Sequence, residues 1–458
     1  MSKNPYRNLP SVDALMESPE LRAIDLGHQP KVEAVRNALA HARQVISDGA
    51  DAPNFEMLVG RTMDILDELT RPRLRNVINA TGVMIHTNLG RAPLMVDETV
   101  SSHGYSNLEF DLVTGKRGSR RSHLEELICD LCGAESALVV NNTAAAVLLM
   151  LTARARGKEV LISRSELVEI GGSFRVPEIM EASGAILREV GTTNRTYARD
   201  YEQAINANTA AILKVHRSNF RVSGFTHEAT TSELVELAER HRLPFWYDLG
   251  SATFGPLPSE LPVECDVRAE LAAGIDVGCF SGDKLLGGPQ SGILVGKEKA
   301  IAELASHPMA RALRVGKLTI KHMQDVLLAY RRGRTADITL SAMLNSTLEE
   351  LEGRGQQIVS LLEAAGVKAE LVPSEDPIGG GSHPDQTLPG LAVRLDYPKG
   401  INRIAKRLRE ASTPVICVIR DNAIHLHVRT LLTTQFETLA NAVISSVAPE
   451  ATSSNGSA

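Results

Sequence analysis

The sequence predicts an α/β fold in which a mostly parallel sheet forms the large domain, between an N-terminal helical domain and a smaller C-terminal α+β domain. In the middle of the 458-residue chain, short and nearly continuous apolar runs alternate with helix-length segments, which is typical of strands buried on both faces. The first part of the chain has helical apolar spacing, and the last part mixes helices with strands. We therefore expect domains at 1–70, 71–335 and 336–450, and a disordered tail at 451–458.

The N-terminal domain is expected to be entirely helical. Helix starts are marked by capping residues or prolines at Ser11, at Ser18 with Pro19, at Pro30 and at Asn54. Acidic and basic residues nearly balance here, and the segment has no glycine-rich phosphate loop. These features favour a binding or assembly module over a catalytic one.

The strands of the large domain are expected at six apolar runs, 137–140, 160–162, 185–187, 210–213, 245–247 and 277–280, with a further run at 292–296. In the C-terminal domain we expect strands at 391–395 and 415–419. A glycine-rich loop at 378–383 precedes them, and the sequence gives it no role.

Lys284 is the residue best suited to covalent chemistry. It follows the apolar run at 275–280, and a lysine at the mouth of a buried strand is desolvated, which lowers its pKa and makes its amine nucleophilic, as a Schiff base requires. Upstream, Asp248 ends another strand, where a carboxylate can keep a pyridine nitrogen protonated so that pyridoxal phosphate (PLP) accepts electrons. Each residue alone is equally compatible with the rim of any α/β sheet. The ordered pair favours a PLP site.

A phosphate site is expected where Asn142 and Thr143 precede an alanine-rich helix, because a helix N-terminus offers unpaired N–H groups and a partial positive charge. Ordinary helix capping explains the same two residues. Ser281, three residues before Lys284, can add a hydroxyl to this site.

Three arginines form a second candidate cluster. Arg91 follows a glycine turn, and Arg311 and Arg314 are three residues apart, so that they project from one helical face. Arginine is the preferred partner for a phosphate-like oxyanion. A solvated basic surface is the alternative.

The composition narrows the class of protein. The net charge of −6 gives no overall signature of nucleic-acid binding, so a tRNA contact must be local, and we expect no DNA partner. An odd number of cysteines, at 129, 132, 265, 279 and 417, predicts reduced thiols, and Cys129 and Cys132 are expected in a helix rather than in a redox motif. The N-terminus lacks a signal peptide and the longest apolar run, 144–151, is too short to cross a bilayer, which predicts a cytoplasmic protein without a membrane partner.

Other cofactor classes find no support in the sequence. It contains neither a G-x-G-x-x-G motif after a strand nor a Walker A loop. His425 and His427 would share a strand face, but no further ligand lies nearby in sequence, so we expect a structural pair and no metal site.

Long motifs in one order along the chain resemble the bacterial selenocysteine synthase family, whose activity is L-seryl-tRNA(Sec) selenium transfer. The motifs lie at 79–92, 105–109, 115–119, 140–142, 166–172, 190–196 and 281–290, the last reading Ser-Gly-Asp-Lys-Leu-Leu-Gly-Gly-Pro-Gln. The likeness extends from the N-terminal helices to residue 418.

This resemblance implies a fold-type I PLP-dependent transferase with a sheet of the seven-stranded type, an N-terminal domain that binds tRNA, and a homo-oligomer built as a ring of dimers, expected to be a decamer. The catalytic residues it implies are Lys284, Arg91, Arg311 and Arg314, and Asp283 is added as a hypothesis because it lies beside the lysine. The cofactor-binding residues expected from the sequence and the resemblance together are Lys284, Asp248, Asn142, Thr143, Ser281 and His216.

The resemblance also implies the chemistry. The enzyme would convert L-seryl-tRNA(Sec) into L-selenocysteinyl-tRNA(Sec) by β-elimination of water and addition of selenium from selenophosphate, with Lys284 removing and returning the Cα proton. Asp283 would assist departure of the hydroxyl or orient an arginine. Because the substrate carboxylate is esterified to tRNA, the arginines are free to bind an oxyanion donor.

Some positions depart from the family pattern. Thr143 stands where an asparagine is expected, and Arg217 and Gly316 replace a small polar and an acidic residue, which puts the details of the donor pocket in doubt. The alternative function is a PLP-dependent lyase acting on a small amino acid or amino sugar phosphate without tRNA. A catalytically inactive tRNA-binding scaffold is a third interpretation, against which the intact Lys284 argues.

Overall fold

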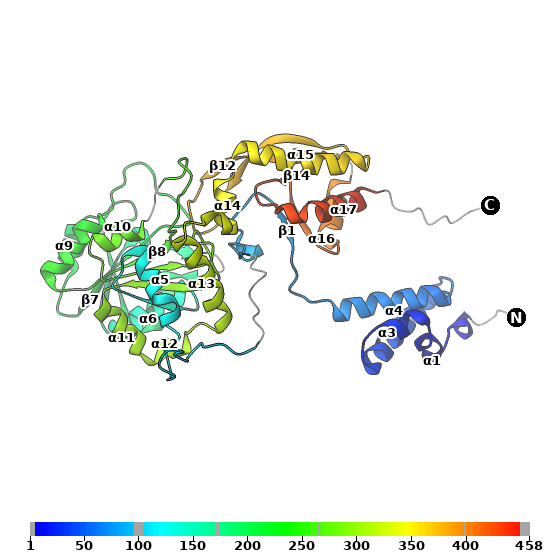
Figure 1. Ribbon diagram of the computed structural model, residues 1–458, viewed down its shortest axis with the longest axis horizontal. Coiled ribbons are helices and arrows are strands. Elements are labelled where there is room, and N and C mark those ends of the chain that lie inside the picture. Colours follow the sequence, from blue (N-terminus) through cyan, green and yellow to red (C-terminus); the bar gives the residue numbers. More distant parts are fainter. Residues whose placement is uncertain (1–4, 96–103, 171–173, 263–265, 398–399, 449–458) are drawn as a thin grey trace. The chain divides into compact units, whose positions relative to one another are not determined.

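The computed structural model describes residues 5–95, 104–170, 174–262, 266–397 and 400–448. The chain divides into two compact units, Met1–Asn76 and Val77–Ala458 (Figure 1). The second unit contains both the large sheet and the C-terminal sheet. The expected boundaries at 70 and 335 therefore remain predictions, and the tail at 451–458 lies outside the described residues.

The first unit is helical, as the sequence predicts. Its helices are α1 (Val12–Met16), α2 (Pro19–Ala23), α3 (His28–Ser47) and α4 (Phe55–Thr70), after a 3₁₀ turn at Pro5–Asn8. Ser11, Ser18 and Asn54 accept hydrogen bonds from backbone N–H groups in the first turns of α1, α2 and α4, so the capping predictions are confirmed. The buried Lys31 donates from Nζ to the carbonyl oxygen of Leu21 at 2.7 Å, which satisfies an orphan acceptor at the end of α2.

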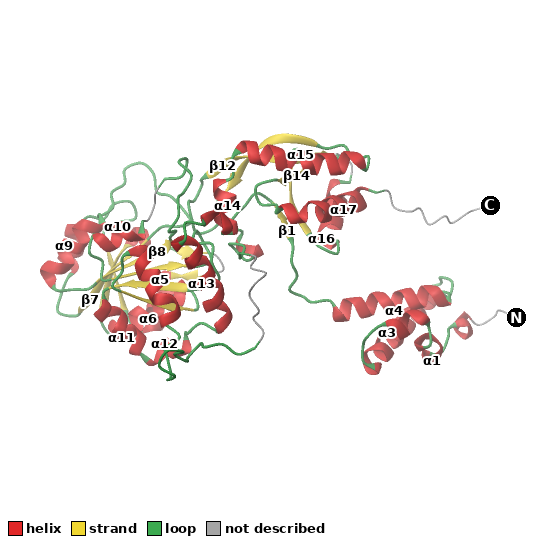
Figure 2. Ribbon diagram, viewed as in Figure 1, coloured by secondary structure: helices red, strands yellow, loops and turns green. Residues whose placement is uncertain are grey.

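The second unit is built around a seven-stranded sheet in the order β2-β10-β9-β8-β7-β3-β6 (Figure 2). The strands are β2 (Ser136–Val140), β3 (Glu159–Ser163), β6 (Ile186–Val190), β7 (Thr209–Val215), β8 (Phe245–Ser251), β9 (Val277–Ser281) and β10 (Gly292–Gly296). Only β10 runs antiparallel to its neighbours in this sheet. The prediction of a mostly parallel α/β sheet is confirmed.

Helices cover both faces of this sheet, which explains why its strands are almost continuously apolar. One apolar core joins the sheet to α5 (Ser122–Cys132), α9 (Thr231–His241) and α13 (Lys317–Arg331). The other core joins it to α6 (Thr143–Arg154), α7 (Val176–Ser183) and α11 (Glu298–Ser306). The carboxyl ends of the parallel strands share one edge, where polar side chains from several strands meet.

The C-terminal sheet has five strands in the order β1-β13-β14-β12-β11. They are β1 (Ile78–Ala80), β11 (Glu370–Pro377), β12 (Thr387–Asp396), β13 (Val415–Arg420) and β14 (Ala423–His427). The helices α15 (Leu348–Ala364), α16 (Ile401–Glu410) and α17 (Phe436–Val447) pack on the sheet. The sequence did not predict β1, which pairs in parallel with β13 and ties the start of this unit to its end.

The described cysteines are free thiols. Cys129 and Cys132 lie in α5, and burial raises the pKa of both, that of Cys129 to about 11. A raised pKa disfavours the reactive thiolate, so these thiols are not activated. Cys265 lies outside the described residues. No helix in the described ranges is long and apolar enough to cross a membrane.

Candidate active site

Lys284 lies in a tight turn directly after β9, and only 4 % of its surface is exposed. The Gly287 N–H donates to the Lys284 carbonyl oxygen at 2.9 Å and closes the turn. Burial lowers the pKa of Lys284, the Asp248 carboxylate opposes this shift, and the Arg91 guanidinium lowers the pKa further. A larger share of this amine is therefore neutral and nucleophilic than in an exposed lysine.

Asp248 lies in β8, the strand next to β9, and is also buried. Its carboxylate accepts the Gly250 N–H at 3.0 Å, and the Cys279 thiol from β9 also bonds it. Burial raises the pKa of Asp248, against the opposing effects of the Gly250 N–H and of Lys284. A buried carboxylate in this position is stabilised by a cationic partner.

His216 follows β7 and lies beside the same strand. Its backbone N–H donates to the Asp248 carbonyl oxygen at 2.8 Å. The structure therefore brings Lys284, Asp248 and His216 together at the carboxyl ends of three adjacent strands.

Two hydroxyl groups meet near the start of α6. Thr143 Oγ1 and Ser281 Oγ are 2.6 Å apart, which joins the helix N-terminus to the end of β9. The Asn142 side chain accepts the Ala145 N–H at 2.8 Å and caps the helix, as the simpler of the two sequence interpretations expects. The two hydroxyls and the free N–H groups of the first turn remain suited to an anion.

Of the three candidate arginines, Arg91 is the one that forms an ion pair with the lysine turn within the described residues. Its Nη1 donates to Asp283 Oδ2 at 2.8 Å, and Asp283 is 6 % exposed. The Ala92 N–H donates to the Asp283 carbonyl oxygen at 3.1 Å, so backbone and side chain hold the two segments together. Arg91 has φ 64°, a left-handed conformation directly after the left-handed Gly90, and this double turn aims the segment at Asp283.

The prediction that Arg311 and Arg314 project from one helical face is wrong, because the helix ends at Ala312, between them. Arg311 is in α12 (Pro308–Ala312), and Arg314 follows it, bridged through its backbone to Val140 at the end of β2. The Arg314 guanidinium is 3.6 Å from Glu109 Oε1. Within the described residues, neither arginine has an ion pair with Asp283.

A group of buried charged residues around β7 was not predicted from the sequence. Glu166, after β3, is 1 % exposed and accepts the Val215 N–H at 3.1 Å. Burial raises its pKa to about 8, against the opposing charge of Lys214. Glu228 bridges Lys214 at 3.1 Å and Arg217 at 2.6 Å. The signal in the sequence was a lysine inside an apolar strand, which requires a buried acidic partner.

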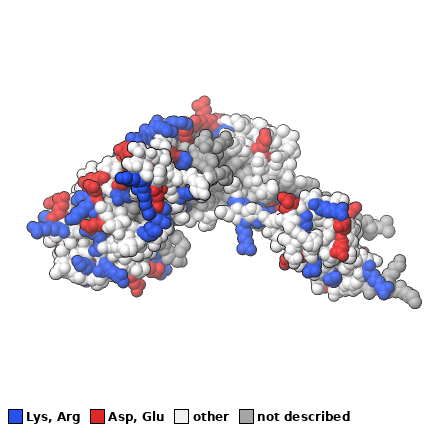
Figure 3. All heavy atoms as spheres, turned by 60° about the horizontal axis from the view of Figure 1, so that its bottom comes forward, with Lys and Arg blue, Asp and Glu red and all other residues white. Residues whose placement is uncertain are grey.

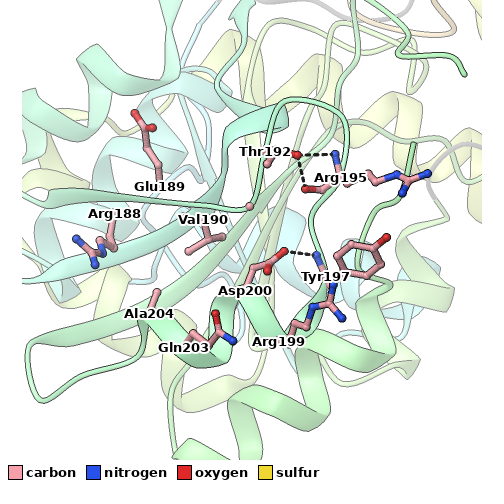
Figure 4. A pocket seen from close by; sticks show the side chains of 11 residues that line it. Arg188, Glu189, Val190, Thr192, Arg195, Tyr197, Arg199, Asp200, Gln203 and Ala204 are labelled. Atoms are coloured by element: carbon pink, nitrogen blue, oxygen red, sulfur yellow. Dashed lines mark hydrogen bonds between the residues drawn. The ribbon is translucent and has the colours of Figure 1, made fainter. Parts of the chain in front are cut away.

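A hollow of about 580 Å³ lies at the edge strand β6 and α8 (Ala198–Ala204) (Figure 4). Its lining includes Arg188, Arg195 and Tyr197, from or near the motif at 190–196. Because β6 is four strands from β9, the two regions are about 19 Å apart at the usual strand spacing of about 4.8 Å. The hollow is therefore separate from the lysine site of the same chain.

A mostly parallel seven-stranded sheet, with a buried lysine after one strand and a buried aspartate on the next, defines the class as fold-type I PLP-dependent enzymes. The solved structure of D-glucosaminate-6-phosphate ammonia-lyase has this fold, with a TM-score of 0.55 over 86% of this chain and 98% of that chain. At 19% identity the similarity shows the fold alone.

The sequence comparisons define the family. The model of L-seryl-tRNA selenium transferase matches residues 77–432, and that of the selenocysteine synthase N-terminal region matches residues 6–43. The L-seryl-tRNA(Sec) selenium transferase of Moorella thermoacetica is 44% identical over 456 residues, covering 97% of each chain. That of Geobacter sulfurreducens is 44% identical over 453 residues, covering 93% of this chain and 96% of the relative. The chain belongs to the L-seryl-tRNA selenium transferase family, as its motifs predict.

Proposed function

We propose that this protein converts L-seryl-tRNA(Sec) into L-selenocysteinyl-tRNA(Sec), with PLP as cofactor and selenophosphate as selenium donor. The observation that carries the proposal is the pair of buried groups on neighbouring strands, the Lys284 amine and the Asp248 carboxylate, in a chain of this family. The lyase alternative is not favoured, because the relatives that match nearly the whole chain are selenium transferases.

The residues present fit PLP. Asp248 is a buried carboxylate, for which a protonated pyridine nitrogen is a suitable cation. The hydroxyls of Thr143 and Ser281, with the N-terminus of α6, suit the phosphate. When bound, PLP supplies an aldehyde to the lysine and a ring that accepts the electron pair released at the substrate Cα.

Lys284 would carry the proton transfers. Its lowered pKa makes the neutral amine available to take the proton from the seryl Cα and later to return it. The site is dry, since Lys284, Asp283 and Asp248 are each buried, and a proton held on Lys284 Nζ is not readily lost to bulk water. Asp283, fixed by Arg91, would orient that arginine or assist departure of the seryl hydroxyl.

Arg91, Arg311 and Arg314 would bind the phosphate group of selenophosphate. Arg91 keeps 30% of its side chain exposed while it is held by Asp283, so part of its fork remains available to a ligand. The ester bond to tRNA removes the substrate carboxylate that would otherwise compete for these cations.

The N-terminal helical domain, residues 1–70, would bind the tRNA. On the face shown in Figure 3, basic and acidic side chains are interspersed over the described residues, so the tRNA contact would be local. We also propose a homo-oligomer, a ring of dimers such as a decamer, in the cytoplasm where aminoacylated tRNA is used. Exposed apolar side chains at Tyr105, Leu112 and Val113 support a protein interface in this segment.

The direct test is incubation of the purified protein with seryl-tRNA(Sec) and selenophosphate, followed by measurement of selenocysteinyl-tRNA. We expect product only when both substrates are present. Turnover of a free amino acid that is unchanged by tRNA would contradict the proposal. Deletion of residues 1–70 should weaken tRNA affinity and leave cofactor binding intact.

A further inference from the structure

The glycine-rich loop of the C-terminal sheet lies against the lysine site. It follows β11, and its first residues run beside the segment that leads to Arg91, with a parallel bridge between Ile85 and Gly379. The Ile85 N–H donates to the Ile378 carbonyl oxygen at 2.7 Å, and the Gly380 N–H donates to the Ile85 carbonyl oxygen at 3.3 Å. The loop is therefore hydrogen-bonded to the chain segment that reaches Asp283.

Gly381 is the residue of this loop that faces the catalytic amine. A Cβ at this position would lie 2.6 Å from Lys284 Nζ and 2.7 Å from its Cε, closer than atoms in contact can approach. Gly381 also has φ 84°, a conformation that favours glycine. The amine is thus covered by bare backbone.

Hydrogen bonds on both sides hold the loop in place, so it cannot easily move away from Lys284. Just before it, the fully buried Asp376 accepts from His427 at 2.6 Å and from Arg429 at 3.1 Å. At its last residue, the buried His383 has its Nε2 2.8 Å from the Pro262 carbonyl oxygen. A side chain added at Gly381 would therefore displace the lysine rather than the loop.

We infer that Gly381 is a positioning residue for the proposed reaction, because its missing side chain leaves the room in which the Lys284 amine is held. This inference rests on the proposed function. A reacting carbon must come within about 3.5 Å of the lysine amine. A methyl group at Gly381 would collide with Lys284 Nζ and push the amine out of the position that this distance requires.

The buried Ser382 adds a second indication that this loop faces a ligand. Within the described residues, Ser382 Oγ and His383 Nδ1 are buried and have no hydrogen-bond partner. Unsatisfied buried polar atoms are costly, and a bound polar group would relieve that cost.

Gly381→Ala in the full-length protein tests the inference, with Gly366→Ala as the matched control. Gly366 has φ 76°, so alanine meets the same backbone strain, but nothing lies within 4 Å of its Cβ position. We expect kcat/KM for seryl-tRNA(Sec) to fall about 100-fold in Gly381→Ala, because the amine is displaced by about 1 Å. Gly366→Ala should stay within about two-fold of wild type, since it lacks the contact. Wild-type kcat/KM in Gly381→Ala would overturn the inference.

A double-mutant cycle on thermal stability tests the contact between Gly381 and Lys284 independently of enzyme activity. The melting temperature of the cofactor-free, full-length chain is measured with and without Gly381→Ala, in the Lys284 and the Lys284→Ala backgrounds. Since Lys284→Ala removes the colliding atoms, roughly half or more of the loss caused by Gly381→Ala should disappear in that background. An equal loss in both backgrounds, or failure to fold in both, would overturn the inference. If the wild type makes no selenocysteinyl-tRNA, the proposed function fails, while this cycle still decides whether Gly381 faces the amine.

Discussion

Arg91 Nη1 donates to Asp283 Oδ2 at 2.8 Å, a contact between residues 192 positions apart in the chain. Asp283 immediately precedes Lys284, and Arg91 ends the segment that runs beside the glycine-rich loop. The pair therefore connects a cation suited to an oxyanion with the turn that holds the reactive amine. The two side chains differ in exposure: Asp283 is nearly buried, whereas the arginine side chain remains 30% exposed.

Because the two side chains are in direct contact, Arg91→Ala and Asp283→Asn should affect catalysis in a non-additive way. We expect a coupling energy of about 1 kcal/mol in a double-mutant cycle on kcat/KM for selenophosphate. Arg91→Lys should recover little, because lysine lacks the guanidinium fork. Strict additivity of the two substitutions would contradict an orienting role for Asp283.

Lys284→Ala should abolish both the visible absorbance of the bound cofactor and turnover. The reason is that this is the buried amine with a lowered pKa beside Asp248. Absorbance spectroscopy after addition of PLP and the product assay measure the two effects. Lys299→Ala, on the exposed side of α11, is the matched control and should behave as wild type. Retained colour and activity in Lys284→Ala would remove that residue from its role.

Asp248→Asn should keep the fold and lower the rate. The amide has the shape of the carboxylate and can still accept the Gly250 N–H, but it cannot stabilise a cation. We expect kcat to fall by about 10² to 10⁴, the range for loss of a positioned acid or base, while some PLP remains bound. Single-turnover kinetics and PLP titration separate the two effects. An unchanged kcat would mean that Asp248 does not contact the pyridine nitrogen of PLP.

The buried lysine–aspartate pair was predictable because its signals are local. Lys284 follows β9, and Asp248 follows the apolar run 245–247 inside β8, and parallel strands bring the carboxyl-terminal parts of such runs to one edge. Asn142 was equally visible as a helix cap. To predict these residues, only the secondary structure and the strand direction had to be known.

The remaining features depend on contacts that local sequence does not encode. The three-residue strand β1 is too short to stand out, and it pairs with residues 415–417 at the other end of the unit. The loop that holds Gly381 was visible as glycine-rich, but its position over Lys284 follows from the packing of the C-terminal sheet. Glu166 looked like an ordinary polar residue after a strand, since only the fold buries it.

Glu166 should give the protein a pH-dependent stability. Burial raises its pKa to about 8 from the ordinary carboxyl value of 4.5, so between these values the folded protein binds a proton that the unfolded chain has lost. The free energy of unfolding should therefore fall as pH rises through this range, by at most about 1.4 kcal/mol per pH unit. The charged groups around Glu166 are Lys214, Glu228 and Arg217. Although burial opposes it, Lys214 and Arg217 lower the pKa of Glu228, so Glu228 changes the stability of the fold only below pH 4.5.

Glu166→Gln removes the titrating group and should flatten this dependence. The amide keeps an oxygen acceptor for the Val215 N–H, so the local hydrogen bond can persist. Denaturant unfolding of the full-length chain at several pH values between 5 and 8.5 measures the slope. Glu236→Gln, at an exposed position in α9, should leave the slope as in wild type. If Glu166→Gln keeps the wild-type slope, the proton is held by another group and the carboxyl of Glu166 is ionised in the folded state.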